Sequence, residues 1–113
     1  ITRSHIIEAL ARLHGMGPSS VVLSLGSRGA MARNSTDIAE VLPPRVDAVC
    51  PIGAGDALAA ALVWAMDKGK PFVDAVRWGV AAGTASAQLP GITFANLEAT
   101  TEIYRQVDVR FVS

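Results

Sequence analysis

The chain has 113 residues, half of them hydrophobic, and ten acidic and ten basic side chains that give a formal net charge of zero. This length fits one small domain with a hydrophobic core, and the charge balance gives no sign of a surface for nucleic acid or anionic membranes. The single cysteine excludes an internal disulfide and a thiolate cluster. Because this is typical of a reducing compartment, we expect a cytoplasmic protein.

Hydrophobic periodicity and turn residues predict the elements along the chain. They are a helix over 4–14 capped by Ser4, strands over 21–25, 30–33 and 38–42, an extended piece over 45–49, helices over 57–68, 72–88 and 96–106, and a final strand over 107–112. The near-continuous apolarity of 21–25 favours a strand buried on both faces of a parallel sheet. Trp64 and Trp78 are expected to fill the core.

The longest uncharged apolar run, Ala57–Met66, is about half the length of the roughly 20 residues that a membrane-spanning helix needs. We therefore expect no membrane partner. His5 and His14 have no further ligand at metal spacing and are expected at the surface.

Two glycine loops follow extended segments, at Gly26–Gly29 and at Gly53–Asp56. Alternating strands and helices indicate an α/β layer structure. In open α/β sheets, ligands sit beyond the C-terminal ends of the strands, where both loops would lie. The pattern therefore predicts one ligand between the two loops.

The loop Gly53-Ala54-Gly55-Asp56 directly precedes a long alanine-rich helix. Glycine lets backbone N–H groups approach a charged ligand closely, and a helix N-terminus supplies unpaired N–H donors and a positive dipole end. Asp56 would be a carboxylate beside the attacking oxygen, which suits phosphoryl transfer to an alcohol. The simpler alternative is that Asp56 only caps the helix and the glycines only make a turn.

Three segments in order resemble the ribokinase/PfkB superfamily of sugar kinases. Pro51–Asp56, followed by Ala60–Val63, is similar to the catalytic-loop signature of the family, Ser24–Ala30 to its nucleotide loop and Arg77–Ala85 to its adenine-side helix. The likeness is greatest to the branch with 1-phosphofructokinase and tagatose-6-phosphate kinase. Ile52 stands where Val is usual, and Cys50 where Asn, Ser or Asp is usual.

The resemblance implies an ATP-dependent phosphoryl transfer to the hydroxyl of a sugar or sugar phosphate. The fold would be the C-terminal part of a three-layer α/β/α ribokinase-like fold with a mostly parallel sheet, over residues 1–113. Asp56 would be the general base, and the N–H groups of Gly53, Ala54 and Gly55 the anion hole. The residues implied at ATP are Ser24, Gly26, Ser27, Gly29, Val80, Gly83 and Thr84. Arg28, within the nucleotide loop, would contact either phosphate or water.

The resemblance also implies Mg²⁺ with the ATP. In some family members backbone carbonyls hold a monovalent cation, which points to K⁺ at the matching positions here, Cys50, Ile52, Ser86, Leu89, Gly91 and Thr93. A homodimer is left open.

The first residue is not Met, and the segments that bind the sugar in the family have no match here. We therefore expect a fragment of a longer kinase. Two alternatives remain open, namely a nucleotide-binding or assembly module without catalysis, and an α/β subdomain that binds nothing by itself.

Overall fold

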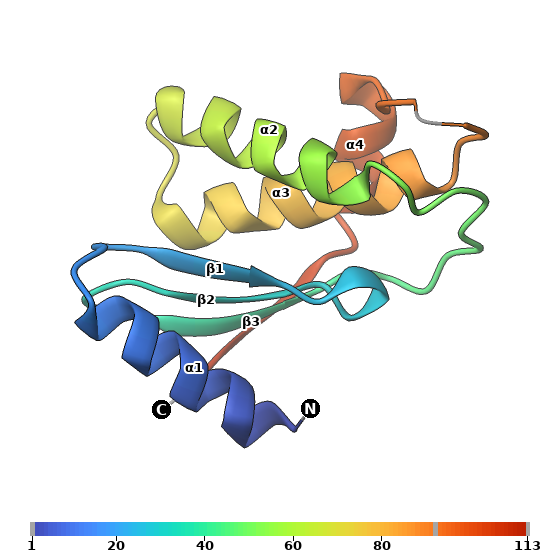
Figure 1. Cartoon of the computed structure of the whole chain (residues 1–113). Coiled ribbons are helices and arrows are strands. Elements are labelled where there is room, and N and C mark those ends of the chain that lie inside the picture. Colours follow the sequence, from blue (N-terminus) through green and yellow to red (C-terminus); the bar gives the residue numbers. More distant parts are fainter. Residues whose placement is uncertain (1, 92, 113) are drawn as a thin grey trace.

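The computed structural model describes residues 2–91 and 93–112. The elements are α1 (Arg3–Gly15), β1 (Val21–Ser24), the 3₁₀ helix η1 (Gly26–Arg28), β2 (Ala30–Arg33), β3 (Ile38–Leu42), α2 (Ala54–Asp67), α3 (Phe72–Ala87), α4 (Leu97–Tyr104) and β4 (Asp108–Phe111). Figure 1 shows three layers, with α1 on one face of the sheet and α2 and α3 on the other. The expected α/β class is confirmed.

The sheet of the described residues is antiparallel throughout, in the order β1-β2-β3-β4, and not mostly parallel as expected. Short turns are the physical reason for the pairs β1–β2 and β2–β3, because a parallel connection needs a crossover of a dozen or more residues. Strand β4 pairs with β3 only after α2, α3 and α4, so no short turn sets its direction. The Leu25 N–H donates to the Gly29 carbonyl at 2.8 Å, and the Asn34 side chain accepts from the Asp37 N–H at 2.7 Å. Each turn reverses the chain at once. Strand β1 is only half-buried, and Ser24 at its end is exposed.

The expected extended piece at 45–49 forms no strand. The backbone amides of Val49 and Cys50 instead donate to the carbonyl of Ala87, at 2.8 and 2.9 Å. That carbonyl lies in the last turn of α3, where carbonyls have no partner within the helix. The segment is therefore tied to the end of a helix rather than to a strand.

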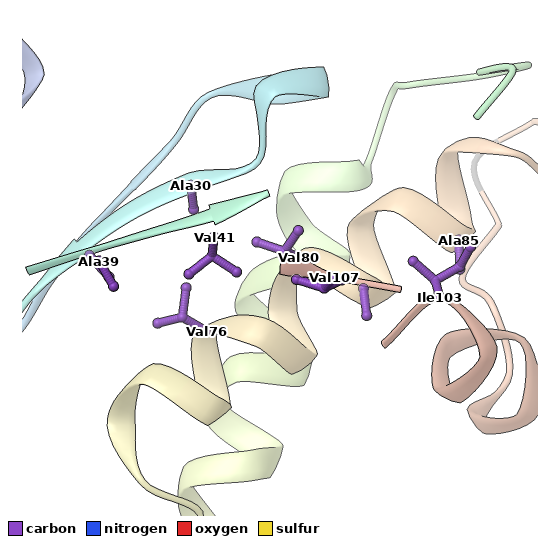
Figure 2. Close-up of a cluster of buried hydrophobic side chains, with 10 residues drawn as sticks. Ala30, Ala39, Val41, Val76, Val80, Ala85, Ile103 and Val107 are labelled. Atoms are coloured by element: carbon purple, nitrogen blue, oxygen red, sulfur yellow. The ribbon is translucent and has the colours of Figure 1, made fainter. Parts of the chain in front are cut away.

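The main core lies between the sheet and the helical layer of α2 and α3. Figure 2 shows Val41 of β3 facing Val76 and Val80 of α3, and burial of each such side chain contributes about 1.5–3 kcal/mol. A second cluster, made by Ile6, Leu10 and Met31, joins α1 to the other face of the sheet.

Helix α4 is fastened to α3 through Tyr104. The Tyr104 ring stacks on Trp78 with centroids 3.9 Å apart, and the Arg77 guanidinium lies 4.0 Å from the centre of the same ring. The Tyr104 hydroxyl donates to the Asp74 carboxylate, and the Arg77 Nε donates to the Tyr104 carbonyl at 3.1 Å. Burial, aided by Asp74, raises the pKa of Tyr104 above its usual value.

The predicted helices α3 and α4 and the last strand are confirmed within a few residues. Three details differ. Thr2, not Ser4, caps α1, since its side chain accepts from the His5 N–H. Helix α2 begins at Ala54, so Asp56 lies inside its first turn and is not the cap. Trp64 is 39% exposed and does not fill the core.

Candidate functional site

A cavity of about 660 Å³ opens between the sheet and the helical layer. Four stretches of the chain line it. They are the end of β1 with the following glycine loop (Ser24, Gly26, Ser27, Gly29), the segment from Pro43 to Ala48, the start of α2 with the preceding Pro51 (Pro51, Ala54, Gly55, Leu58), and the second half of α3 (Val80, Gly83, Thr84, Ala87). All seven residues implied at ATP line this one cavity, while their contacts with a ligand stay a prediction.

The glycine loop is shaped by two residues with positive φ. Gly26 has φ of +60° and Gly29 has φ of +83°, a region that side chains other than glycine rarely adopt. A Cβ on Gly29 would lie 2.0 Å from the Val41 carbonyl oxygen. Only glycine therefore allows the loop to lie this close to the end of β3.

The second loop places free N–H donors at the start of α2. Gly53 precedes the helix in the left-handed conformation, with φ of +88°. The Ala54 N–H, expected in the anion hole, donates to the Pro51 carbonyl at 3.1 Å. Within the described residues the backbone amides of Gly53, Gly55 and Asp56 have no such partner. These three amides, with the positive end of the helix dipole, are the donors open to an anion.

Asp56 stands at the edge of the site. It is an exposed residue of the first turn of α2 and is not among the residues that line the cavity, whereas its neighbour Gly55 is. Its carboxylate takes part in none of the ion pairs of the described residues. The group is thus open to a second substrate arriving beside the cavity.

Two glycines of α3 let this helix approach the start of α2. A Cβ on Gly79 would lie 2.9 Å from the Leu58 carbonyl oxygen, and a Cβ on Gly83 the same distance from that of Ala54. Gly83 therefore has a packing role that the sequence did not reveal. It lies against the first turn of α2 and also lines the cavity.

Two charged residues of the cavity were missed from the sequence. Arg45 and Asp47 line it, whereas Arg28, expected to contact phosphate or water, is exposed and does not line it. The available signal was a pair of opposite charges in the short stretch between Pro43-Pro44 and the second glycine loop.

The positions matched to a monovalent cation fall near the end of α3. Cys50 is linked to α3 through Ala87, and the Ser86 hydroxyl accepts from the Ala95 N–H at 2.9 Å. The Leu89 N–H donates to the Ser86 carbonyl at 3.1 Å, and the Thr93 hydroxyl to the Pro90 carbonyl at 3.0 Å. Ile52 and Gly91 are exposed. These bonds bring two segments together, but cation binding itself stays a prediction.

The described residues contain no group of three or more His, Cys, Asp or Glu that could hold a metal ion. His5 is exposed and His14 half-buried on α1, and neither lines the cavity. Helix α1 lies on the face of the sheet opposite α2 and α3 (Figure 1). No described helix has the length and apolarity that crossing a membrane requires.

Comparison with known proteins gives concordant matches. Residues 2–99 match the sequence profile of the pfkB family carbohydrate kinase. The chain is 39% identical over 72 residues to 1-phosphofructokinase of Borreliella burgdorferi and 34% identical over 84 residues to ATP-dependent 6-phosphofructokinase isozyme 2 of Escherichia coli. Those matches cover 63% and 74% of this chain.

Among solved structures, phosphofructokinase-2 from Escherichia coli in complex with potassium aligns with a TM-score of 0.89 and 29% identity, over 94% of this chain. The matches cover only part of each relative. This chain spans 24% and 27% of the two curated relatives and 35% of the solved chain.

Proposed function

This chain belongs to the pfkB family of carbohydrate kinases, and on that premise we propose that it forms the nucleotide side of an ATP-dependent phosphoryl transfer to a sugar hydroxyl. The observation that carries the proposal is one cavity that the glycine loop, the start of α2 and α3 line together. Its volume lies within the range of about 300–1,000 Å³ common for small-molecule sites.

Within this proposal, Val80, Gly83 and Thr84 lie beside the adenine. Ser24, Gly26, Ser27 and Gly29 lie along the ribose and phosphates. The amides of Gly53, Gly55 and Asp56 face the phosphoryl group, where fixed donors stabilise the charge that develops during transfer. These assignments are supported by the positions of the residues, which line the cavity or lie beside it.

Asp56 acts as the general base. Its carboxylate accepts the proton of the sugar hydroxyl while the hydroxyl oxygen forms a bond to the γ-phosphorus of ATP, and the bond from that phosphorus to the bridging oxygen breaks to leave ADP. The exposed position of Asp56 next to Gly55 supports this role, because the acceptor must approach from outside the nucleotide cavity.

Magnesium belongs with ATP in this reaction, where it neutralises phosphate charge. Because no cluster of potential ligands occurs among the described residues, we assign no residue of this chain to it. For K⁺ we propose the backbone carbonyls near Cys50 and the end of α3, since the similar Escherichia coli structure was determined with potassium.

The relatives named as phosphofructokinases suggest a hexose phosphate as acceptor. We infer that the residues selecting the sugar lie outside these 113 residues, because the chain spans about a quarter of those relatives. The cytoplasm is the compartment proposed, where the sugar phosphate and ATP meet, and a homodimer is a further proposal that light scattering would test.

The competing function is a nucleotide-binding or assembly module without catalysis, which the position of Asp56 outside the cavity lining favours. Calorimetry on the 113-residue chain tests the proposal directly. We expect ATP to bind in the presence of Mg²⁺ and K⁺, and no ADP to form when fructose 6-phosphate is added. An absence of ATP binding would contradict the proposal, and ADP formation would show that the chain is active by itself.

A further inference from the structure

The segment from Pro43 to Ala48 crosses the cavity between two fixed points. At one end, Pro43 lies against the glycine loop, since a Cβ on Gly29 would come within 2.8 Å of the Pro43 Cδ. At the other end, Val49 and Cys50 are hydrogen-bonded to Ala87 of α3. Two consecutive prolines restrict the backbone at the first end. The segment is thus held in place although it forms no regular element.

Side chains alternate along this segment. Val46 is half-buried and packs against the main core, while Arg45 and Asp47 on either side of it are exposed. All three residues line the cavity. Because Val46 packs on the core, it holds this part of the segment in place, and its two exposed charged neighbours lie where the cavity meets solvent.

Arg45 is the only cationic residue among the described residues that line the cavity, and Asp47 the only anionic one. Arg45 forms none of the ion pairs within the described part of the chain. Its position, two residues from Pro43, is near the glycine-loop end of the cavity. A guanidinium there has no internal carboxylate to satisfy it, and phosphate oxygens match its planar donors best.

We propose that Arg45 binds the phosphate chain of the nucleotide and makes the cavity prefer a nucleoside triphosphate over the nucleoside. The inference rests on the proposed nucleotide function of this cavity. Asp47 disfavours phosphate at its own end of the segment by charge repulsion, so the two residues together orient the phosphates toward the glycine loop.

The test measures the affinities of the 113-residue chain for ATP, ADP, AMP and adenosine by calorimetry. We expect Arg45→Ala to weaken ATP binding about five- to tenfold, a range that one charge-assisted contact can supply. The loss should shrink from ATP to AMP and vanish for adenosine. Arg45→Lys should restore part of the ATP affinity, and Asp47→Asn should tighten ATP binding slightly.

Two matched controls remove the same charge elsewhere. Arg12 lies on α1, and Arg12→Ala should leave ATP affinity unchanged. Arg28 lies in η1 outside the cavity lining, and Arg28→Ala should weaken ATP binding less than Arg45→Ala does. An equal loss for adenosine and ATP in Arg45→Ala would overturn the inference, as would a full loss in Arg28→Ala with none in Arg45→Ala. If the unmodified chain binds no nucleotide, the proposed function itself fails. Circular dichroism confirms folding, and should Arg45→Ala unfold, the comparison of Arg45→Lys with Arg45→Gln decides the question.

Discussion

A Cβ on Gly83 would lie 2.9 Å from the carbonyl oxygen of Ala54. This contact joins α3, the most buried helix, to the first turn of α2, where the amides without a backbone partner lie. Because the approach is between a glycine and a backbone atom, no side-chain rotation can make room for a larger residue. The geometry of the first turn of α2 therefore depends on a residue of another helix, Gly83.

We expect Gly83→Ala to push the start of α2 away from α3. Overpacking of this kind costs about 1–3 kcal/mol of unfolding free energy, and ATP affinity should fall as well. Denaturant unfolding and calorimetry measure the two effects. Gly15→Ala is the control, since a Cβ at Gly15 meets nothing within 4 Å, and unchanged stability in Gly83→Ala would contradict the packing role.

Asp56→Asn tests the proposed base. In a kinase-active protein that contains this chain, turnover should fall by roughly 10²–10⁴-fold, because the amide cannot accept the hydroxyl proton. ATP binding should be retained. Asp67→Asn, at another exposed residue at the other end of α2, serves as the control, and steady-state kinetics are the measurement. Near-normal turnover of Asp56→Asn would rule out the assigned role.

The raised pKa of Tyr104 makes stability depend on pH in the alkaline range. Burial is the main cause, and the hydrogen bond to Asp74 adds to it. Since the folded state favours the neutral phenol, its contribution is fully present below the ordinary tyrosine pKa near 10 and is lost as pH rises through the raised value. Unfolding free energy should therefore fall above about pH 10, and less so in Tyr104→Phe.

Tyr104 is the single tyrosine of the chain, so phenolate absorbance follows its ionisation without interference. Asp74→Asn should lower the pKa of Tyr104 toward the usual value, because the carboxylate charge is removed. At neutral pH, Tyr104→Phe should cost about 0.5–1.5 kcal/mol for the lost hydrogen bond. A phenol that titrates at the ordinary value in the folded protein would refute this account.

Ser86→Ala should destabilise the chain by about 1–3 kcal/mol, because the buried Ser86 hydroxyl accepts from the Ala95 N–H and its loss leaves that donor unpaired. Thr93→Val, which removes an exposed hydroxyl that donates to Pro90, should cost less. If K⁺ is held by backbone carbonyls as proposed, K⁺ should raise the ATP affinity of Thr93→Val as much as that of the unmodified chain. Calorimetry in K⁺ and in Na⁺ checks this.

The helices could be predicted because their signals are local. Gly69 and Pro71 mark the break between α2 and α3, and Asn96 accepts from the Ala99 N–H at the start of α4 as a typical cap. Sheet direction could not be predicted, because apolarity in Val21–Ser24 does not distinguish a central parallel strand from a half-buried edge strand. The prediction of an extended piece near Val49 was wrong for a similar reason. Residues that favour strands also occur in a segment that is hydrogen-bonded to the end of a helix.

The candidate site divides in the same way. Glycines 26, 29 and 53 were predictable because glycine marks tight turns in the sequence. In the structure each of them takes positive φ. Arg45 was missed because its position on the cavity depends on Val46 packing into the core and on Pro43 meeting Gly29, contacts between segments that no local pattern reports. Conversely, Arg28 lay inside the recognised loop but does not line the cavity.

The cavity has walls from β1, from the segment after β3, and from both long helices, so no single element can form it. A ligand held there recognises only the assembled tertiary structure and has no counterpart in the unfolded chain. Binding and folding are then thermodynamically linked, and ATP at about 100 times its dissociation constant would add about 2.7 kcal/mol to the free energy of unfolding. Bound nucleotide would thus link strand β1 to the helices that line the cavity. Hydrogen exchange of the backbone amides in β1 and in α2 should therefore be slower with ATP than without it.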